Sequence, residues 1–390
     1  MSRMRFGVFI PPYDMPTSAN PTLAFQDNVE LVQHLDRLDY DEAWVGEHHS
    51  CGVELIGDPL IFIAHAAQVT RNIKLGAGVI STPYHNPFHI AERSVMLDHL
   101  TRGRFFLGLG PGAIPTDAAM LGLHSSQLRG ALEEDTEVII QLIHGDEPVT
   151  KKTDRYNLVD ARLHLAPYSD FDIVVAAIAS PTGPRVAGRH GLGLISVGAT
   201  MVGDLNILAM HWDVAEEMAR DNGTTVQRDK WRLVAPMYIA ETREQALKDC
   251  EYGIDAWFEY LQKTAATPHF RPPGTSLEDR INWVNESGSG IIGTPDDAIA
   301  MIEELVKESG GGFGTFLMLG HHWARPEKMA QHYKLFADYV MPRFQGSIKR
   351  RIDAEKWART KFDELSEEQA QALVAAKETH EKYRAERDTN

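Results

Sequence analysis

Three consecutive side chains able to bind protons, Glu47, His48 and His49, directly follow a short segment at 42–46 that is predicted to be a strand. A carboxylate beside two imidazoles suits acid–base chemistry, because an imidazole changes its protonation near neutral pH. Adjacent residues of an extended segment point in opposite directions, so only one histidine is expected to face a shared site. The alternative is a structural pair, in which one histidine caps a helix and the other is solvated.

A metal site would need further nitrogen or oxygen ligands beside these histidines. The candidates elsewhere in the sequence are His85, His89, Asp98, His321 and His322. No His-Glu-x-x-His pattern occurs. A zinc hydrolase that uses His48 or His49 with His321 or His322 therefore stays an open alternative, and we predict no metal.

Two further stretches have the composition of binding segments. Gly76 and Gly78 lie inside an apolar run, where glycine weakens a strand unless another group comes close to the backbone. That group is either a flat ring or the next helix. The run Ala179-Ser180-Pro181-Thr182 precedes a helical pattern, so its hydroxyl and N–H groups either bind a phosphate or simply cap the helix.

These residues belong to a repeating pattern of short apolar strands and amphipathic helices. Strands are predicted at 5–10, 42–46, 73–80, 104–109, 172–177, 192–197, 231–239 and 313–318. Helices are predicted at 22–38, 59–71, 87–101, 129–143, 182–190, 204–222, 242–262, 295–309 and 326–340. Eight alternating units predict an α/β protein with a closed (β/α)8 TIM barrel. A Rossmann sheet is disfavoured, since Pro11-Pro12-Tyr13-Asp14 replaces the glycine-rich turn expected after its first strand.

The barrel domain is predicted over residues 1–345, with a helical extension at 346–390 whose composition shifts to charged helix formers. Insertions are expected at about 110–128, 145–171 and 263–290, and a hairpin is predicted from 155–158 and 162–165. Long loops on a barrel shape the mouth of the active site. The extension either wraps the outside, packs on a partner subunit or is a solvated helix.

Composition limits the class of protein. The formal net charge is −16 at pH 7, which argues against nucleic acid or an anionic membrane as the main partner. Two cysteines, Cys51 and Cys250, make neither a disulfide framework nor a thiolate metal domain. The sequence contains no apolar stretch of about 18 residues and no signal-peptide pattern at its start, so a cytoplasmic protein is expected.

Several stretches together resemble the bacterial luciferase-like monooxygenases, discontinuously over about residues 4–345. The stretches are Phe6-Gly7-Val8-Phe9, Glu47-His48-His49, Leu75 to Gly112 with Arg102-Gly103-Arg104-Phe105, Gly122 with Arg129, Val174 to Ser196, and Gly293-Thr294-Pro295. Among subfamilies, the limonene and related hydrocarbon monooxygenases are the most similar.

The resemblance implies a two-component flavin-dependent monooxygenase. Reduced FMN, delivered by a separate NAD(P)H:flavin reductase, would react with O₂ to a C4a-(hydro)peroxyflavin and insert one oxygen atom into an apolar small organic substrate. His48 matches the catalytic histidine of the family. Cofactor-binding positions are Gly78 and Val79, where the family often has a non-prolyl cis peptide, together with Ala179, Ser180, Thr182 and Arg129. The family also implies a homodimer, for which the helices near 59–71 and 87–101 are expected contact faces.

The sequence departs from luciferase itself at several positions. Pro111 and Gly110 stand where luciferase has an arginine and a reactive cysteine, and Ile178 and Ala179 replace a glutamate and a serine of its phosphate loop. Light emission is therefore not implied, and Arg185 or Arg129 is expected to contact the phosphate. Substrate-pocket candidates near the strand ends are Phe9, Trp44, Leu109, Met201 and Trp323. The alternatives are a deazaflavin-dependent hydride-transfer oxidoreductase on the same fold and a non-catalytic flavin-binding protein.

Overall fold

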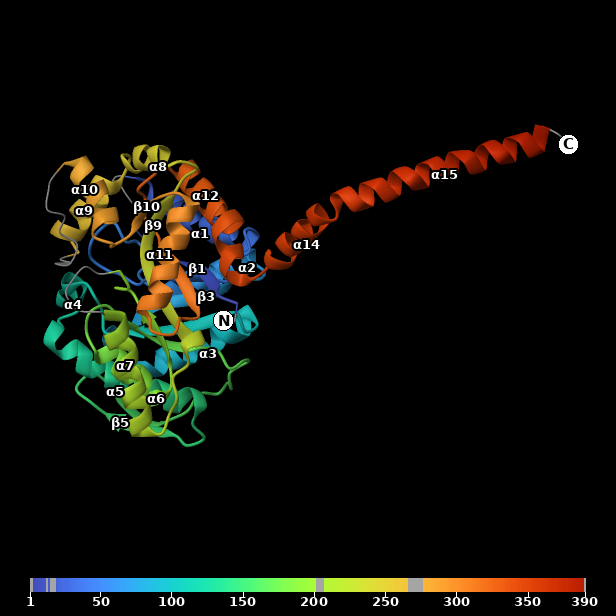
Figure 1. Cartoon of the computed structure of the whole chain (residues 1–390). Helices are drawn as coiled ribbons and strands as arrows, with labels where there is room; N and C mark the ends of the chain where they lie inside the picture. The colour runs from blue at the N-terminus through green and yellow to red at the C-terminus, as the bar shows by residue number, and fades with distance from the viewer. Residues whose placement is uncertain (1–2, 12, 15–18, 201–206, 266–275, 389–390) are drawn as a thin grey trace. The chain divides into compact units, whose positions relative to one another are not determined.

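The computed structural model describes residues 3–388, apart from residues 12, 15–18, 201–206 and 266–275. The chain divides into two compact units, Met1–Phe344 and Gln345–Asn390. Figure 1 shows the helices of the first unit arranged around its strands. Within the described part of the chain, no helix is both long enough and apolar enough to cross a membrane.

Eight parallel strands close a barrel in the first unit, which confirms the predicted fold class. They are β1 (Arg5–Ile10), β2 (Glu42–Val45), β3 (Lys74–Ser81), β4 (Phe105–Gly110), β7 (Ile173–Ala177), β8 (Gly193–Ser196), β9 (Trp231–Ile239) and β11 (Thr315–Leu319). Each pairs with its neighbour in that order, and β11 pairs with β1 to close the ring. A ninth strand, β10 (Ile291–Gly293), pairs with the end of β9.

Helices follow the strands as the sequence pattern predicts. The long ones of the first unit are α1 (Pro21–Arg37), α2 (Pro59–Val69), α3 (Pro87–Thr101), α5 (Ser125–His144), α6 (Thr182–His190), α7 (Ile207–Asn222), α9 (Ile254–Lys263), α10 (Leu277–Glu286), α11 (Pro295–Glu308) and α12 (Pro326–Leu335). The short ones are η1 (Thr82–Tyr84), α4 (Pro115–Met120), η2 (Arg228–Lys230), α8 (Arg243–Cys250), η3 (Phe336–Val340) and α13 (Met341–Gln345).

Two predicted elements differ from the structure. The helix predicted at 242–262 is two helices, α8 and α9, separated by a turn at residues 251–253. A Cβ atom at Gly253 would lie 1.9 Å from the carbonyl oxygen of His322, so the chain passes too close to another backbone for a side chain. The hairpin is present, but its strands are β5 (Val149–Lys152) and β6 (Asn157–Ala161), so the predicted pair 155–158 and 162–165 is wrong.

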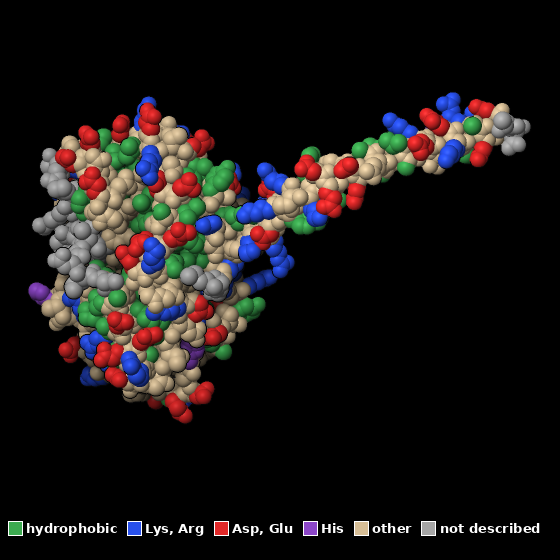
Figure 2. All heavy atoms as spheres, in the orientation of Figure 1, with side chains coloured by type: hydrophobic (Ala, Val, Ile, Leu, Met, Phe, Trp, Pro, Cys, Tyr) green, Lys and Arg blue, Asp and Glu red, His purple; other side chains and the backbone are tan. Residues whose placement is uncertain are grey.

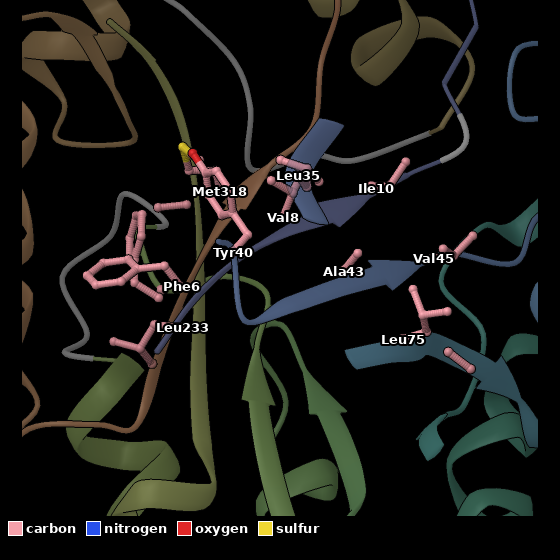
Figure 3. Close-up of a cluster of buried hydrophobic side chains, with 14 of the residues drawn as sticks. Phe6, Val8, Ile10, Leu35, Tyr40, Ala43, Val45, Leu75, Leu233 and Met318 are labelled. Atoms are coloured by element: carbon pink, nitrogen blue, oxygen red, sulfur yellow. The ribbon is translucent and has the colours of Figure 1, made fainter. Parts of the chain in front are cut away.

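Alternating strand residues make two apolar layers. The outer layer lies between strands and helices and includes Phe6, Val8 and Ile10 of β1, which Figure 3 shows near Leu35 and Tyr40. The inner layer fills the barrel with Phe9, Trp44, Phe106, Val174, Ile195, Val234 and Leu317. The barrel is therefore a packed core below the mouth, not a channel.

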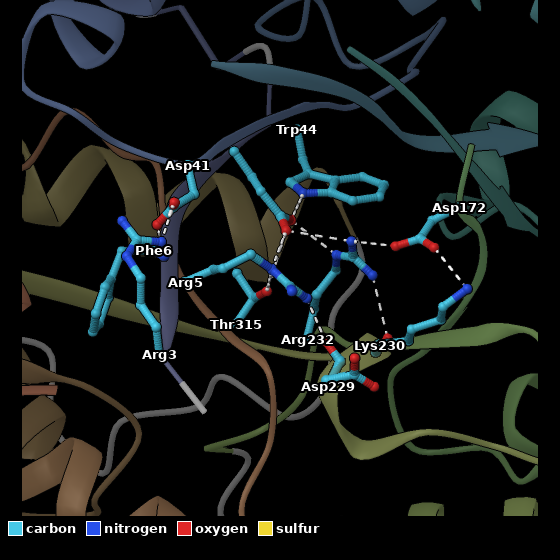
Figure 4. A network of polar contacts seen from close by, with 11 residues as sticks. Arg3, Arg5, Phe6, Asp41, Trp44, Asp172, Asp229, Lys230, Arg232 and Thr315 are labelled. Atoms are coloured by element: carbon cyan, nitrogen blue, oxygen red, sulfur yellow. Dashed lines mark hydrogen bonds and ion pairs between the residues drawn. The ribbon is translucent and has the colours of Figure 1, made fainter. Parts of the chain in front are cut away.

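A charged network lies inside the barrel toward the N-terminal ends of the strands (Figure 4). The Arg232 guanidinium, which has no exposed surface, donates from Nε to Glu42 Oε2 at 2.8 Å and from Nη2 to Asp172 Oδ2 at 3.0 Å. Glu42 also accepts hydrogen bonds from Trp44 Nε1 and Arg5 Nε. Charges buried in this way are tolerated because they are paired and hydrogen-bonded.

The second unit is helical. It consists of α14 (Lys349–Thr360) and α15 (Phe362–Asp388), and none of their residues is buried. Figure 2 shows acidic and basic side chains interspersed along these helices. Ion pairs one turn apart, such as Lys349 with Asp353 and Arg359 with Glu355, stabilise α14.

Helix α2 starts at a cap that can be tested. Asp58 accepts hydrogen bonds from the backbone N–H groups of Leu60 and Ile61, which have no partner within the helix. Asp58→Ala is expected to lower the free energy of unfolding by about 1 kcal/mol. Chemical denaturation measures this loss. The control is Asp58→Asn, which keeps an acceptor oxygen; an equal loss in both variants would contradict the capping role.

Candidate active site

The Glu47–His48–His49 segment leaves β2 at the C-terminal ends of the barrel strands, where active sites of this architecture lie. The two imidazoles have different partners, as expected for neighbours on an extended segment. His49 pairs with Glu47, whereas His48 pairs with Asp117 and Glu54. The segment therefore builds two adjoining polar clusters, one around each of these histidines.

The first cluster surrounds the buried carboxylate of Glu47. Its Oε1 atom accepts from His49 Nε2 at 2.9 Å and from His85 Nε2 at 2.6 Å. Its Oε2 atom accepts from the backbone N–H of Ser81 at 2.7 Å, which links β2 to the end of β3. Burial alone would raise the pKa of Glu47, but these hydrogen bonds hold it below its ordinary value, so the group is ionised.

The second cluster holds His48 between two carboxyl groups. Asp117 Oδ2, from α4, lies 3.1 Å from Nδ1, and Glu54 Oε2 lies 3.3 Å from Nε2. Asp117 Oδ1 also accepts from the backbone N–H of His49 and from Ser50 Oγ. Tyr260 hydrogen-bonds the Glu54 carboxyl. The loop after β2 and helix α4 are thus joined through Asp117.

The cluster shifts the pKa of each member. Burial would lower the pKa of His48, but the hydrogen bond to Asp117 and the charge of Glu54 raise it. Burial raises the pKa of Glu54, whereas hydrogen bonds from His48, Ser50 and the His49 backbone lower that of Asp117 despite its own burial. Perturbed groups gathered at the mouth of a barrel indicate a functional site.

Several buried polar atoms beside these clusters have no partner among the described residues, including the hydroxyls of Tyr13 and Tyr84. The Tyr13 ring packs on Tyr260 with centroids 5.1 Å apart and on His322 at 5.8 Å. An unpaired buried hydroxyl costs free energy, so such atoms indicate places for ligand or water contacts.

Between the clusters and the charged network of Arg232, the barrel interior is an apolar, closely packed layer. The peptide between Gly78 and Val79 is cis, as expected from the resemblance. A Cβ atom at Gly78 would lie 2.9 Å from the Phe9 ring, so no larger residue fits there. Ala176, Val197 and Leu319 are partly buried against the same inner layer. The predicted residues Phe9, Gly78 and Val79 therefore meet in the floor beneath the strand ends.

The predicted phosphate segment lies at the N-terminus of α6. Ser180 Oγ is 3.0 Å from Thr182 Oγ1 and accepts from the Thr182 N–H. Of the two arginines considered for a phosphate, Arg185 pairs with Glu133 of α5 at 3.5 Å. Arg129 is an exposed residue of the same helix, one turn before Glu133.

Three other predicted pocket residues are buried in the packed layers of the barrel unit. Trp44 is fully buried in the inner layer, where its indole donates to Glu42. Leu109 is buried in the outer layer, between strand and helices. Trp323 is fully buried and stacks on His321 with centroids 3.9 Å apart. Met201 lies outside the described residues.

Sequence reasoning did not identify the partners of His48. Glu54 lies in the loop after β2, Asp117 on α4 and Tyr260 on α9, so no local spacing connects them. The one available signal was the location of Asp117 inside the predicted insertion at 110–128. In the described residues, no group of three or more His, Cys, Asp or Glu side chains is arranged to hold a metal ion.

A surface groove of about 440 Å³ lies elsewhere, between the C-terminal ends of α2 and α3. Its lining includes Arg71, Arg102 and Arg104. Arg104 donates to the carbonyl oxygens of Ala67 and Ile73 and so caps the C-terminal end of α2. These residues precede β3 and β4, so the groove is at the end of the barrel opposite to His48.

Comparison with known proteins bears on the chemistry of this arrangement. Residues 4–311 match the model of the luciferase-like monooxygenases. The limonene 1,2-monooxygenase of Rhodococcus erythropolis is 44% identical over 350 residues, covering 90% of this chain and 89% of that protein. The 4-hydroxyprotoasukamycin monooxygenase of Streptomyces nodosus subsp. asukaensis is 40% identical over 354 residues, covering 89% and 94%.

Solved structures share the fold at lower sequence identity. The oxygenating constituent of 3,6-diketocamphane monooxygenase from Pseudomonas putida, a type II Baeyer-Villiger monooxygenase in complex with FMN, has a TM-score of 0.71 at 23% identity, covering 88% of this chain and 99% of that one. An F₄₂₀-dependent secondary alcohol dehydrogenase has a TM-score of 0.64 at 17% identity, covering 87% and 98%. At these identities the likeness establishes the barrel alone.

Proposed function

Because this chain belongs to the luciferase-like monooxygenase family, we propose that it is the oxygenase of a two-component flavin-dependent system that inserts one oxygen atom from O₂ into an apolar small molecule. The observation that carries the proposal is the set of groups at the strand ends. A histidine held by two carboxyl groups lies in the loop after β2, and β2 pairs with β3, the strand that carries Gly78 and Val79. Proton transfer and a dry, flat binding surface are thereby combined in one site.

The residues present fit a flavin mononucleotide. At Gly78 the Phe9 ring takes the place of a side chain, 2.9 Å from where a Cβ atom would lie, so the floor offers a planar ring an apolar surface. The unpaired hydroxyls of Tyr13 and Tyr84 can hydrogen-bond polar groups of a ligand at the mouth. The phosphate is assigned to the N-terminus of α6, where backbone N–H groups and the hydroxyls of Ser180 and Thr182 gather. Arg129 adds a positive charge on the neighbouring helix α5.

When bound, reduced FMN supplies the electrons that activate O₂. The chain supplies position, exclusion of water and proton control. Gly78 and Val79 support the ring, and Phe9 and Leu319 keep the floor apolar. His48 holds or releases a proton at the mouth, since its pKa lies above that of a free imidazole.

The apolar residues of the same floor also indicate the class of substrate. Ala176, Val197 and Leu319 present apolar surface where the barrel opens, which suits a small hydrocarbon-like molecule. The limonene monooxygenase relative supports this class. We further propose that the enzyme works in the cytoplasm as a homodimer and receives reduced FMN from an NAD(P)H:flavin reductase.

The test is a stopped-flow experiment in which protein and anaerobically reduced FMN are mixed with oxygenated buffer. The wild-type protein is expected to delay the return of oxidised-flavin absorbance at least tenfold relative to free FMN. His48→Ala is expected to shorten the delay, because the proton held at the mouth is lost. The control is His144→Ala, at an exposed position near the end of α5, which should leave the delay unchanged.

Reoxidation at the rate of free flavin in the presence of wild-type protein would reject the monooxygenase proposal. The next experiment would then measure hydride transfer with a reduced deazaflavin, which needs no O₂. Tight flavin binding without either reaction would instead support a non-catalytic flavin-binding protein.

A further inference from the structure

Both ring nitrogens of His48 have partners within the protein itself, which a side chain that only contacts a ligand would not need. Asp117 Oδ2 faces Nδ1 at 3.1 Å and Glu54 Oε2 faces Nε2 at 3.3 Å, so each ring nitrogen has its own carboxyl group. The Glu54 side chain is only 5% exposed and that of Asp117 only 2%. Water therefore has little access to either carboxyl group and cannot readily take its place as the partner of His48.

The protonation of Nδ1 follows from the partners of Asp117. That carboxylate accepts from the His49 backbone N–H through Oδ1, and from the Ser50 hydroxyl at 2.5 Å. Such bonds favour the ionised carboxylate, which can only accept. The third hydrogen bond to Asp117 joins it to His48 Nδ1, so Nδ1 must carry the proton of that bond. When the imidazole is neutral, its lone pair is therefore on Nε2.

The opposite nitrogen needs a second proton. Glu54 Oε2 has no hydrogen bond among the described residues, although it is buried and His48 Nε2 lies 3.3 Å away. Two unprotonated acceptors at that distance would repel each other. A proton therefore resides on one of the two groups, which gives either an imidazolium beside a carboxylate or an imidazole beside a carboxylic acid.

We propose that Asp117 is the positioning residue that keeps a proton on His48 Nδ1, and that Glu54 is the group with which His48 Nε2 shares and exchanges its proton. The inference rests on the proposed function for its purpose. Where the shared proton lies on Glu54, it first moves to Nε2. When Nε2 then gives it to an acceptor at the mouth, His48 is neutral and Glu54 is ionised, and the pair regains one proton from water before the next transfer. Tyr260, hydrogen-bonded to Glu54, holds that carboxyl group in place.

The charged groups around His48 come from two segments. The loop after β2 supplies Glu54 and Glu47, and α4 supplies Asp117. All three are acidic and raise the pKa of His48, against the burial that lowers it. Removing one carboxylate is therefore expected to lower the pKa of His48, while a purely structural contact would change stability without a large effect on that pKa.

The experiment is nitrogen NMR of histidine-labelled protein over a pH series, without flavin. The chain has 17 histidines, so the His48 signals are identified by their loss in His48→Gln. In the wild type we expect a midpoint above the ordinary value of 6.5 and a neutral form protonated on Nδ1. Asp117→Asn and Glu54→Gln are each expected to lower the midpoint by about one pH unit or more.

The control is Glu147→Gln, at an exposed position after α5, which should leave the midpoint unchanged. An unchanged midpoint in Asp117→Asn or in Glu54→Gln would overturn the assigned role of that residue, and so would a neutral wild-type form protonated on Nε2. Circular dichroism verifies that each variant is folded. Since no flavin is present, failure of the flavin reaction leaves this result standing, and an unshifted titration leaves the proposed function standing.

Discussion

Glu42→Leu is expected to lower the free energy of unfolding of the barrel unit by about 3–5 kcal/mol, because it leaves the buried Arg232 guanidinium without its main partner. Arg232 has no exposed surface, and its remaining carboxylate partner is Asp172. Burial would raise the pKa of Glu42, but Arg232 and Arg5 lower it, so the wild-type pair is ionised. Denaturant titration of the wild-type and variant proteins measures the loss.

A double-mutant cycle separates the coupling free energy between Glu42 and Arg232 from the contributions of their other contacts. Arg232→Met alone leaves Glu42 buried with Arg5, Trp44 and Thr315 as its donors. In the double variant both charges are gone, so the combined loss is expected to be clearly smaller than the sum of the single losses. Additive losses would show that the ion pair contributes no coupling and that packing alone explains the effect.

Glu47→Ala is expected to cost about 3 kcal/mol or more in stability and to impair the flavin reaction as well. It removes the acceptor of the two partly exposed imidazoles of His49 and His85, and it leaves the buried N–H of Ser81 unpaired. The carboxylate also ties the end of β2 to the end of β3, so its loss loosens both walls around His48. Thermal or chemical unfolding gives the first readout, and the delay of flavin reoxidation gives the second.

The effect of Glu47 depends on pH in a definite direction. Its pKa lies below the ordinary 4.5, since hydrogen bonds outweigh burial. Its contribution to stability is therefore complete above about pH 4.5 and is lost as pH falls through the lower pKa of the folded state. The stability gap between wild type and Glu47→Gln, which keeps the shape, should narrow on acidification below that value. If the difference in stability did not change with pH, the shape of the Glu47 side chain and not its charge would account for its contribution.

Local patterns predicted the barrel correctly because each strand and helix is encoded by its own periodicity. The strand at 231–239 has the predicted bounds, and the helix predicted at 182–190 is α6. The break at Gly253 was missed, since it results from a close approach to His322, far along the chain. The hairpin was displaced because short exposed strands have weak alternation and depend on pairing for their register.

The sequence by itself determined the eight-stranded barrel, the location of Glu47, His48 and His49 at a strand end, and the family to which the chain belongs. Only the tertiary structure decided that Asp117 and Glu54 flank His48, and that Trp44 and Leu109 are in the packed layers. A strand end is a local property of periodicity. The partners of a side chain depend on how β2, α4 and α9 pack around one mouth, which no spacing along the chain records.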